Sequence, residues 1–243
     1  IVKLYGGKVE VKAYLGGARH SYFANGKRCK SVTGAYAILE KKGLLGWAVG
    51  LYSDYLEQFI VQSLTEEMIV TGENLHSDIK KEASNIGTLA HEWIEKFVKG
   101  EKPEMPENKN VVQAVNGFLE WVDSKKRKFL SAEKLIYSKK HDYVGTLDAT
   151  AIAQGQKLPE VIDYKTSAGL YAPVAYQTAA YLKADEEESK VKYGGRWAIR
   201  LAKETEEEYM LKQEKKLKRY LRKNPDKEPY EIAPYVSFEA KFL

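Results

Sequence analysis

Two aspartates and a lysine in the middle of the chain have the types and spacing needed for metal-dependent chemistry. Asp148 and Asp163 lie in separate β-rich runs, and Lys165 follows the second aspartate by two residues. Because alternate side chains of a strand share a face, Asp163 and Lys165 are predicted to point to one side, with Ile162 and Tyr164 on the other. Two carboxylates beside a lysine are suited to holding a divalent cation next to a negatively charged reacting group.

The segment between the two runs predicts how the aspartates are aligned. A turn signal that includes Gly155 separates the runs, and a two-residue hairpin loop at Gly155-Gln156 places Asp148 directly opposite Asp163. Facing carboxylates repel each other unless a cation lies between them. Pro159 is the feature that would shift this register by one residue, by marking an edge or a bulge.

Four short motifs in this order resemble the PD-(D/E)XK nucleases, specifically their RecB-like exonuclease branch. In sequence order they are Gly87-Thr88-x-x-His91, Gly145-x-x-Asp148, Asp163-Tyr164-Lys165 and Gln177-x-x-x-Tyr181. The resemblance covers roughly residues 80 to 202, and the opening of the chain also looks like phage-type and mitochondrial-type members. It implies an α/β (α+β) fold with a central mixed sheet flanked by helices.

The resemblance also implies a role for each motif residue. One or two Mg²⁺ or Mn²⁺ ions would be held by His91, Asp148, Asp163 and the backbone carbonyl of Tyr164. Lys165, with the two aspartates, would form the catalytic set. The substrate-binding pair would be Gln177 and Tyr181, and Glu133 would occupy the place of a family glutamate that often lies near the site. Glu95, which shares a helix face with His91, is expected either beside the site as a second-shell residue or in a salt bridge.

Each of these roles has a plain structural alternative. Taken alone, His91 fits a hydrogen-bonded core histidine, although it shares a helix face with Glu95 and its neutral imidazole is a competent metal ligand. Glu133 fits an exposed strand glutamate equally well. Gln177 and Tyr181 lie one helical turn apart and fit an ordinary surface glutamine and a packed tyrosine.

The whole chain limits the class of protein. It has 243 residues, 44% hydrophobic and 30% charged, and no apolar run approaches the ~18 residues that a membrane-spanning helix needs. We therefore expect a soluble protein without a membrane partner, intracellular and cytoplasmic, or in the host cytoplasm if the source is viral. A single cysteine, Cys29, cannot supply the four-cysteine iron–sulfur cluster of some RecB-like relatives. The chain also lacks the phosphate-binding motif of ATP-driven motors.

The net charge of +5 is compatible with a polyanionic partner. Basic residues cluster at 125–128 and over 212–227. The second cluster closes a helix that opens with glutamates, so it reads either as a solvated helix complementing its own dipole or as a phosphate-contacting surface.

The elements that must position the motifs follow from residue patterns. We expect one domain: an N-terminal elaboration over 1–76, a catalytic core over 77–202 and a charged helix with a tail over 203–243. The elaboration should hold a hairpin around Asn25-Gly26 and helices over about 33–42 and 45–64.

The core should follow a helix–three strands–helix–strand order, with one further helix before it. The expected helices are 77–98 and 110–129, the strands 132–138, 143–153 and 160–166, then a helix beginning near Pro173 and a strand over 192–201. Residues 185–188 are expected to form an acidic loop.

These observations predict a metal-dependent DNA exonuclease, acting on single-stranded DNA or DNA ends in replication, recombination or repair, together with proteins of those processes. Its alternatives are an endonuclease, a CRISPR-adaptation-type nuclease, and a DNA-binding module on a nuclease scaffold that has lost activity. Retention of Asp148, Asp163 and Lys165 weighs against the last.

Overall fold

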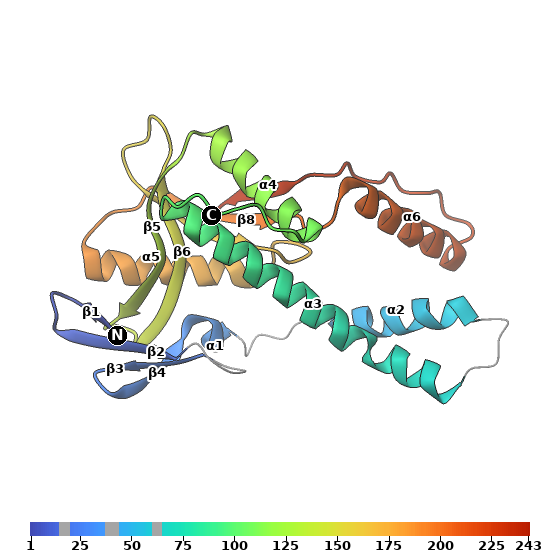
Figure 1. The fold of residues 1–243 in the computed structure, drawn as a ribbon, viewed down its shortest axis with the longest axis horizontal. Helices are drawn as coiled ribbons and strands as arrows, with labels where there is room; N and C mark the ends of the chain where they lie inside the picture. Colours follow the sequence, from blue (N-terminus) through green and yellow to red (C-terminus); the bar gives the residue numbers. More distant parts are fainter. Residues whose placement is uncertain (15–19, 37–43, 60–64) are drawn as a thin grey trace.

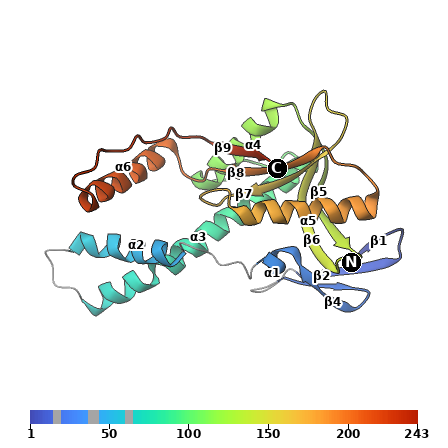
Figure 2. The same cartoon turned by 180° about the vertical axis from the view of Figure 1, so that it is seen from behind.

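The computed structural model describes residues 1–14, 20–36, 44–59 and 65–243, which form a mixed α/β fold (Figures 1 and 2). The described strands are β1 (Val2–Leu4), β2 (Val9–Tyr14), β3 (Ser21–Ala24), β4 (Lys27–Ser31), β5 (Lys128–Ser138), β6 (Tyr143–Ile152), β7 (Glu160–Lys165), β8 (Gly195–Leu201) and β9 (Phe238–Phe242). The described helices are α1 (Val32–Tyr36), α2 (Leu44–Leu56), the 3-10 helix η1 (Glu57–Phe59), α3 (Glu66–Val98), α4 (Lys109–Ser124), α5 (Ala172–Ser189) and α6 (Glu206–Lys223). None of them is long and apolar enough to cross a membrane.

The described strands form one mixed sheet, as the α/β fold class expected. Its order is β1-β2-β3-β4-β6-β7-β8-β9, with β5 pairing along the other edge of β6. The pairs β4–β6 and β7–β8 are parallel and the remaining pairs are antiparallel. The core order of three strands, a helix and a strand is confirmed, from β5 to β8.

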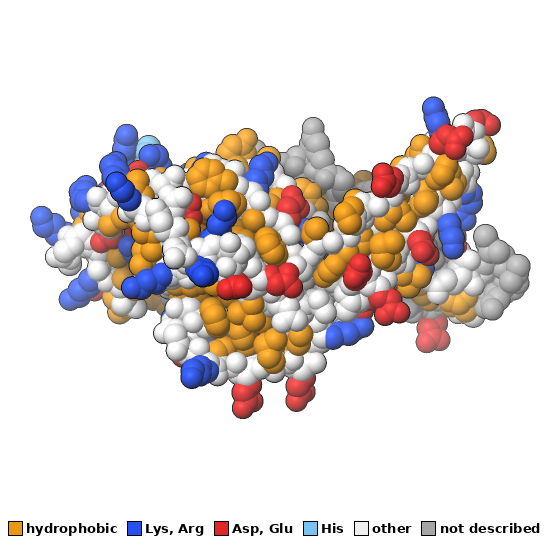
Figure 3. All heavy atoms as spheres, turned by 90° about the horizontal axis from the view of Figure 1, so that it is seen from above, with side chains coloured by type: hydrophobic (Ala, Val, Ile, Leu, Met, Phe, Trp, Pro, Cys, Tyr) orange, Lys and Arg blue, Asp and Glu red, His pale blue; other side chains and the backbone are white. Residues whose placement is uncertain are grey.

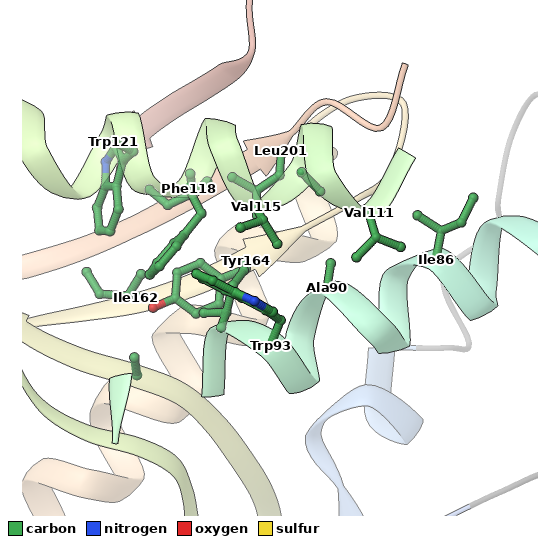
Figure 4. Close-up of a cluster of buried hydrophobic side chains, with 14 of the residues drawn as sticks. Ile86, Ala90, Trp93, Val111, Val115, Phe118, Trp121, Ile162, Tyr164 and Leu201 are labelled. Atoms are coloured by element: carbon green, nitrogen blue, oxygen red, sulfur yellow. The ribbon is translucent and has the colours of Figure 1, made fainter. Parts of the chain in front are cut away.

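Helices cover both faces of the core part of this sheet. On one face, Val111, Val115 and Phe118 of α4 meet α3 and the sheet, and all three are fully buried (Figure 4). Ile162 and Tyr164 of β7 point into this same cluster, as their alternation predicts. On the opposite face α5 packs against β5 to β8, which leaves the sheet buried on both sides.

The N-terminal strands form a lobe that extends this sheet. Asn25 and Gly26 both have positive φ, of 48° and 79°, and connect β3 to β4 in a two-residue turn. This confirms the predicted hairpin, because both central positions of such a turn require that conformation. The lobe joins the core through two parallel pairs, Lys30 with Tyr143 and Ser31 with Val144.

The acidic loop predicted at 185–188 is wrong, because α5 continues to Ser189. Asp185 is fully buried and forms an ion pair with Lys134 of β5, and Tyr193 also donates a hydrogen bond to it. Lys190 then ends the helix in a left-handed conformation. The acidic composition of this run predicted a loop. One of its residues, Asp185, instead holds the helix against the sheet.

Two other helix boundaries differ from the sequence prediction. Helix α3 begins at Glu66 rather than at residue 77, since Thr65 caps it by accepting a hydrogen bond from the Met68 backbone. The helix therefore runs without a break across the predicted division at residue 76. Helix α4 stops at Ser124, because the chain enters β5 at Lys128. The ends of the predicted helices 33–42 and 45–64 lie outside the described residues.

Helices α2 and α3 pack together away from the sheet (Figure 1). The rings of Tyr52 and Tyr55 lie over Gly72, where an added Cβ would come within 2.7 Å and 2.9 Å of them. Two ion pairs link α2 and η1 to α6: Arg219 with Asp54, and Arg222 with Glu57. We call α2, η1 and residues 66–82 of α3 the arm.

Candidate metal centre

The site lies where two strands diverge along one edge of β6. On that edge β4 pairs with β6 at Tyr143 and Val144, whereas β7 pairs with it at 149–151. Residues 145–148 fall between these two ladders. There the side chain of Asp148 replaces a ladder contact: its Oδ2 accepts a hydrogen bond of 2.8 Å from the Tyr164 backbone N–H. The carboxylate is thereby fixed at the point of divergence.

The predicted register between the two aspartate-bearing strands is confirmed. Ala149 pairs with Ile162, and the same register carried one residue further places Asp148 opposite Asp163. The predicted two-residue loop is wrong, because β6 ends at Ile152 and β7 begins at Glu160, so the connection is longer. Pro159 falls in that connection, so it does not shift the ladder.

Asp163 and Lys165 form an ion pair on the shared strand face. Lys165 Nζ lies 2.5 Å from Asp163 Oδ2 and also donates a hydrogen bond of 3.3 Å to the Tyr164 carbonyl. Asp163 is fully buried, and its Oδ1 has no hydrogen-bond donor among the described residues. A buried carboxylate oxygen without a donor fits a position next to a cation.

A second set of donor atoms gathers beside this pair. Ligand atoms of His91, Glu133 and Asp148 all lie within 4.8 Å of one another. Helix α3 supplies the imidazole, β5 the glutamate and β6 the aspartate. Imidazole with carboxylates is a donor set that suits Mn²⁺ and similar divalent ions, and the aspartate oxygens also suit Mg²⁺. The residues present therefore fit the expected metal, with Glu133 inside the close set.

The backbone at Glu133 is unusual for a strand. Its φ is 46°, a conformation that residues with a side chain adopt at a cost. The β5–β6 register is the same on both sides of it, with Ala132 opposite Ala149 and Lys134 opposite Leu147. The strained residue therefore sits across from Asp148.

The carboxylates of the site concentrate negative charge in a small volume. Burial raises the pKa of Asp163, against the opposing effect of Lys165, and the nearby Asp148 raises it further. Burial also raises the pKa of Glu133 to about 8, with additional repulsion from Asp148 and Glu95. A bound divalent cation would reverse these effects, since it favours the ionised carboxylates.

Helix α3 approaches the strands closely at its small residue Gly87. A Cβ at that position would lie 2.8 Å from Thr166 Oγ1, one residue past Lys165. One turn further on, the His91 ring meets the Tyr164 ring edge-on at 6.0 Å. The glycine of the Gly87-Thr88-x-x-His91 motif thus has a packing reason, which is to let the histidine-bearing helix reach β7.

Glu95 lies near the candidate metal centre but is not one of the three residues, His91, Glu133 and Asp148, whose donor atoms gather there. It forms an i,i+4 ion pair with Lys99 and is partly exposed. Its contribution is electrostatic, through the repulsion that helps raise the pKa of Glu133.

Gln177 and Tyr181 are buried rather than exposed, at 5% and 3%. Gln177 Nε2 donates a hydrogen bond of 2.7 Å to the Tyr181 hydroxyl. The Tyr181 ring lies against Gly145 of β6, where a Cβ would come within 2.6 Å of Cε1. These contacts join two of the sequence motifs physically, since the glycine of Gly145-x-x-Asp148 accommodates the tyrosine of Gln177-x-x-x-Tyr181.

Sequence reasoning placed Glu133 near the site but not among its ligands. The missed signal is the turn at Lys139-Lys140-His141-Asp142. A hairpin centred between Lys140 and His141 brings Glu133 opposite Asp148, and the observed ladder has that register.

Comparison of the chain with protein-family models gives no match, and comparison with curated proteins gives none.

Proposed function

We propose that the chain is a divalent-metal-dependent deoxyribonuclease with a PD-(D/E)XK-type core, which degrades single-stranded DNA or DNA ends as an exonuclease. The observation that carries the proposal is the meeting of His91, Glu133 and Asp148 beside the buried ion pair of Asp163 and Lys165. A structural ion pair alone would need neither the imidazole nor the additional carboxylates. An assembly of repelling carboxylates around one lysine is destabilising unless it serves a cation.

In this proposal His91, Glu133, Asp148 and Asp163 hold one or two Mg²⁺ or Mn²⁺ ions. Such an ion supplies an activated water and offsets the charge that develops on the phosphate during hydrolysis. Lys165 provides a fixed positive charge beside Asp163, suited to stabilising the same developing charge. The Tyr164 carbonyl, expected as a ligand, accepts the Lys165 hydrogen bond and so orients the lysine.

Gln177 and Tyr181 have a supporting role in the proposal. Their burial and mutual hydrogen bond suit them to holding α5 against β6, rather than to forming a binding surface. A direct contact between this pair and DNA stays a prediction.

The test is cleavage of end-labelled single- and double-stranded DNA with Mn²⁺, with Mg²⁺ and with EDTA. We expect metal-dependent release of short products from DNA ends, and none from the Asp163→Asn variant prepared in parallel. Internal cuts would favour the endonuclease alternative. DNA binding without cleavage under any metal would overturn the enzyme proposal and leave the binding module.

A further inference from the structure

The positive charge of the chain is concentrated in its N-terminal lobe. Residues 1–31 hold seven Lys or Arg against one Glu, a formal charge of +6, whereas the whole chain carries +5. The remaining residues therefore have a formal charge of −1, and the mildly basic character of the protein belongs to its first 31 residues. Figure 3 shows Lys and Arg side chains crowded at the left end, the end where Figure 1 draws β1–β4.

The lobe sheet has one apolar face and one basic face. Val9, Val11, Tyr22 and Ala24 are buried against Val144 of the core. Alternation turns the other side chains of β2 and β3 outward, so Lys12 of β2, Phe23 of β3 and Arg28 of β4 are aligned in one row across three strands. Lys12, Arg28 and the nearby Lys30 keep their charged side chains at least partly in solvent.

Aromatic rings are set among these charges. Tyr14, on the same face as Lys12, is 57% exposed, and its ring meets Phe23 edge-on at 5.6 Å. An exposed tyrosine held upright by a neighbouring ring offers a flat face to solvent at little cost in side-chain entropy. The only acidic side chain of β2, Glu10, is paired with Lys12 at 3.2 Å.

We propose that this face, defined by Lys12, Tyr14, Phe23, Arg28 and Lys30, binds single-stranded DNA. Cationic side chains with interleaved aromatic rings match a flexible strand, because phosphates attract the cations and unstacked bases stack on the rings. A duplex, whose bases are already stacked, would use only the charges. The charge contrast with the rest of the chain favours an anionic partner over a neutral one, and the exposed ring of Tyr14 favours unstacked bases over an acidic protein.

The position of this face relates it to the metal centre, and here the inference rests on the proposed function. The lobe joins β6 at Tyr143 and Val144, and Asp148 follows on the same strand. At about 3.3 Å per residue, the junction and Asp148 are separated by about 13–17 Å along β6. A strand bound on the lobe would therefore be tethered close to the site, as an anchor outside it.

The experiment measures binding of fluorescent dT20 by anisotropy in EDTA, so it is independent of cleavage. The test variant is Lys12→Gln/Arg28→Gln/Lys30→Gln. Its control, Lys96→Gln/Lys102→Gln/Lys157→Gln, removes the same charge from exposed positions outside the lobe. We expect the test variant to weaken binding at least tenfold and to lower the slope of log K against log salt by about 2, since each lost phosphate contact contributes about 0.7 for single strands. The control should stay within twofold of the unmodified chain.

Stacking is tested separately with Tyr14→Ala and Tyr14→Phe. We expect Tyr14→Ala to weaken dT20 binding about fivefold or more, the lower end of what one stacked base contributes, and Tyr14→Phe to bind normally because it keeps the ring. Equal losses in the test and control charge variants would overturn the proposal. So would an unchanged Tyr14→Ala, or tighter binding of duplex DNA, rU20 or anionic vesicles than of dT20.

The two proposals fail in different ways. If the test variant loses dT20 binding and the unmodified chain shows no metal-dependent cleavage, DNA binding by the lobe would be supported and the nuclease proposal rejected. If the unmodified chain cleaves DNA but the test variant binds dT20 normally, the nuclease proposal would be supported and DNA binding by the lobe face rejected.

Discussion

At the scale of single residues, the metal centre is defined by charges that do not balance. The charges of Asp148 and Asp163 raise the pKa of Glu133, and that of Asp148 raises the pKa of Asp163. The opposing cations among the described residues are Lys165, which forms an ion pair with Asp163, and Lys99, which acts on Glu133 without an ion pair. A folded chain would normally avoid this arrangement, because each added carboxylate costs free energy. The arrangement fits the proposed divalent-cation site, and that proposal leads to three predictions.

The first prediction concerns the ion pair. Lys165→Ala and Asp163→Asn should each reduce cleavage by about a hundredfold or more, since a fixed charge directed at developing negative charge contributes at least that much. Both variants should fold and still bind dT20. The measurement is the initial rate of single-stranded DNA cleavage in Mn²⁺, with circular dichroism as the folding check. Retention of a tenth of the original rate by Lys165→Ala would reject its assigned role.

The second prediction concerns the imidazole. His91→Ala should weaken Mn²⁺ binding by about tenfold or more and reduce the advantage of Mn²⁺ over Mg²⁺, because nitrogen ligands favour the transition metal. Calcium should bind without supporting cleavage. The measurement is the metal dependence of the cleavage rate together with Mn²⁺ titration calorimetry. An unchanged metal profile would mean that His91 is a core residue that merely packs against Tyr164.

The third prediction concerns pH in the absence of metal. The Glu133 pKa is about 8 in the folded chain against an ordinary value of 4.5, so between these values the folded protein holds a proton that the unfolded chain releases. Stability from this group is full below about pH 4.5 and is lost as the pH rises toward 8. The melting temperature in EDTA should therefore fall between pH 5.5 and 8.5.

The variant Glu133→Gln isolates this effect. It should reduce the fall in melting temperature between pH 5.5 and 8.5 by roughly 2–4 °C. A shift of that size is expected in a chain of this length when the free energy of unfolding changes by a small amount. The remaining decline is assigned to Asp163, whose pKa shift has the same sign. Added Mn²⁺ should raise the melting temperature most at high pH. A Glu133→Gln profile that overlays the original would show that Glu133 titrates normally.

At the scale of elements, the two motif glycines explain how helices and strands reach the site. Gly87 lets α3 approach Thr166, and Gly145 lets the Tyr181 ring of α5 approach β6 closely. Each close approach ties one flanking helix to a strand that carries a site residue. Neither contact is visible in a sequence, because a glycine pattern does not say which ring or hydroxyl occupies the space.

What could be predicted from the sequence follows the same division. Strand alternation and hairpin register are local, so they correctly gave the shared face of Asp163 and Lys165 and the alignment of Asp148 with Asp163. The helix ending at Ser189 was missed because the burial of Asp185 depends on Lys134, a residue far away in the chain. Helix polarity alone cannot reveal such a partner.

The fourth prediction tests the Gly145 contact. Gly145→Ala should destabilise the chain by about 1–3 kcal/mol, because the new methyl group meets Tyr181 Cε1 at 2.6 Å and Val32 Cγ2 at 3.1 Å. The control is Gly46→Ala on α2, where an added Cβ meets nothing within 4 Å. Urea unfolding measures both. In combination with Tyr181→Ala the loss should be clearly less than additive, and strict additivity would disprove the contact.

At the scale of the whole molecule, the arm extends the chain beyond the metal centre. Helix α2 does not cover a face of the sheet; it packs on α3 at Gly72, about 28 Å along the helix from His91 at 1.5 Å per residue (Figure 1). The arm therefore does not lie directly over the site. The ion pairs of Arg219 and Arg222 connect it to α6, so two segments far apart in sequence are joined at the outer end of the molecule.

The last prediction is that cleavage requires a free DNA end. The prediction assumes that the strand reaches the site between the arm and α6, which the ion pairs join. A strand with a free end can enter such a passage by threading, whereas a closed circle cannot. Trp47 on the arm is 39% exposed and offers a ring for base stacking. Linear and circular single-stranded DNA of the same sequence, incubated under identical Mn²⁺ conditions, should differ in degradation rate by about a hundredfold or more, as is typical when productive positioning is lost.

Charge reversal at the joint makes this prediction specific to the arm. Arg219→Glu/Arg222→Glu places like charges against Asp54 and Glu57 and should allow slow degradation of the circle. The rate on linear DNA should stay within about threefold, because both pairs are at least partly exposed and such ion pairs contribute little to stability. The matched control Lys215→Glu/Lys218→Glu alters the same helix at exposed positions and should leave the circle resistant. Equal degradation of circular and linear DNA by the unmodified chain would retain a metal-dependent nuclease but remove the exonuclease assignment, since an open site would then accept a strand without an end.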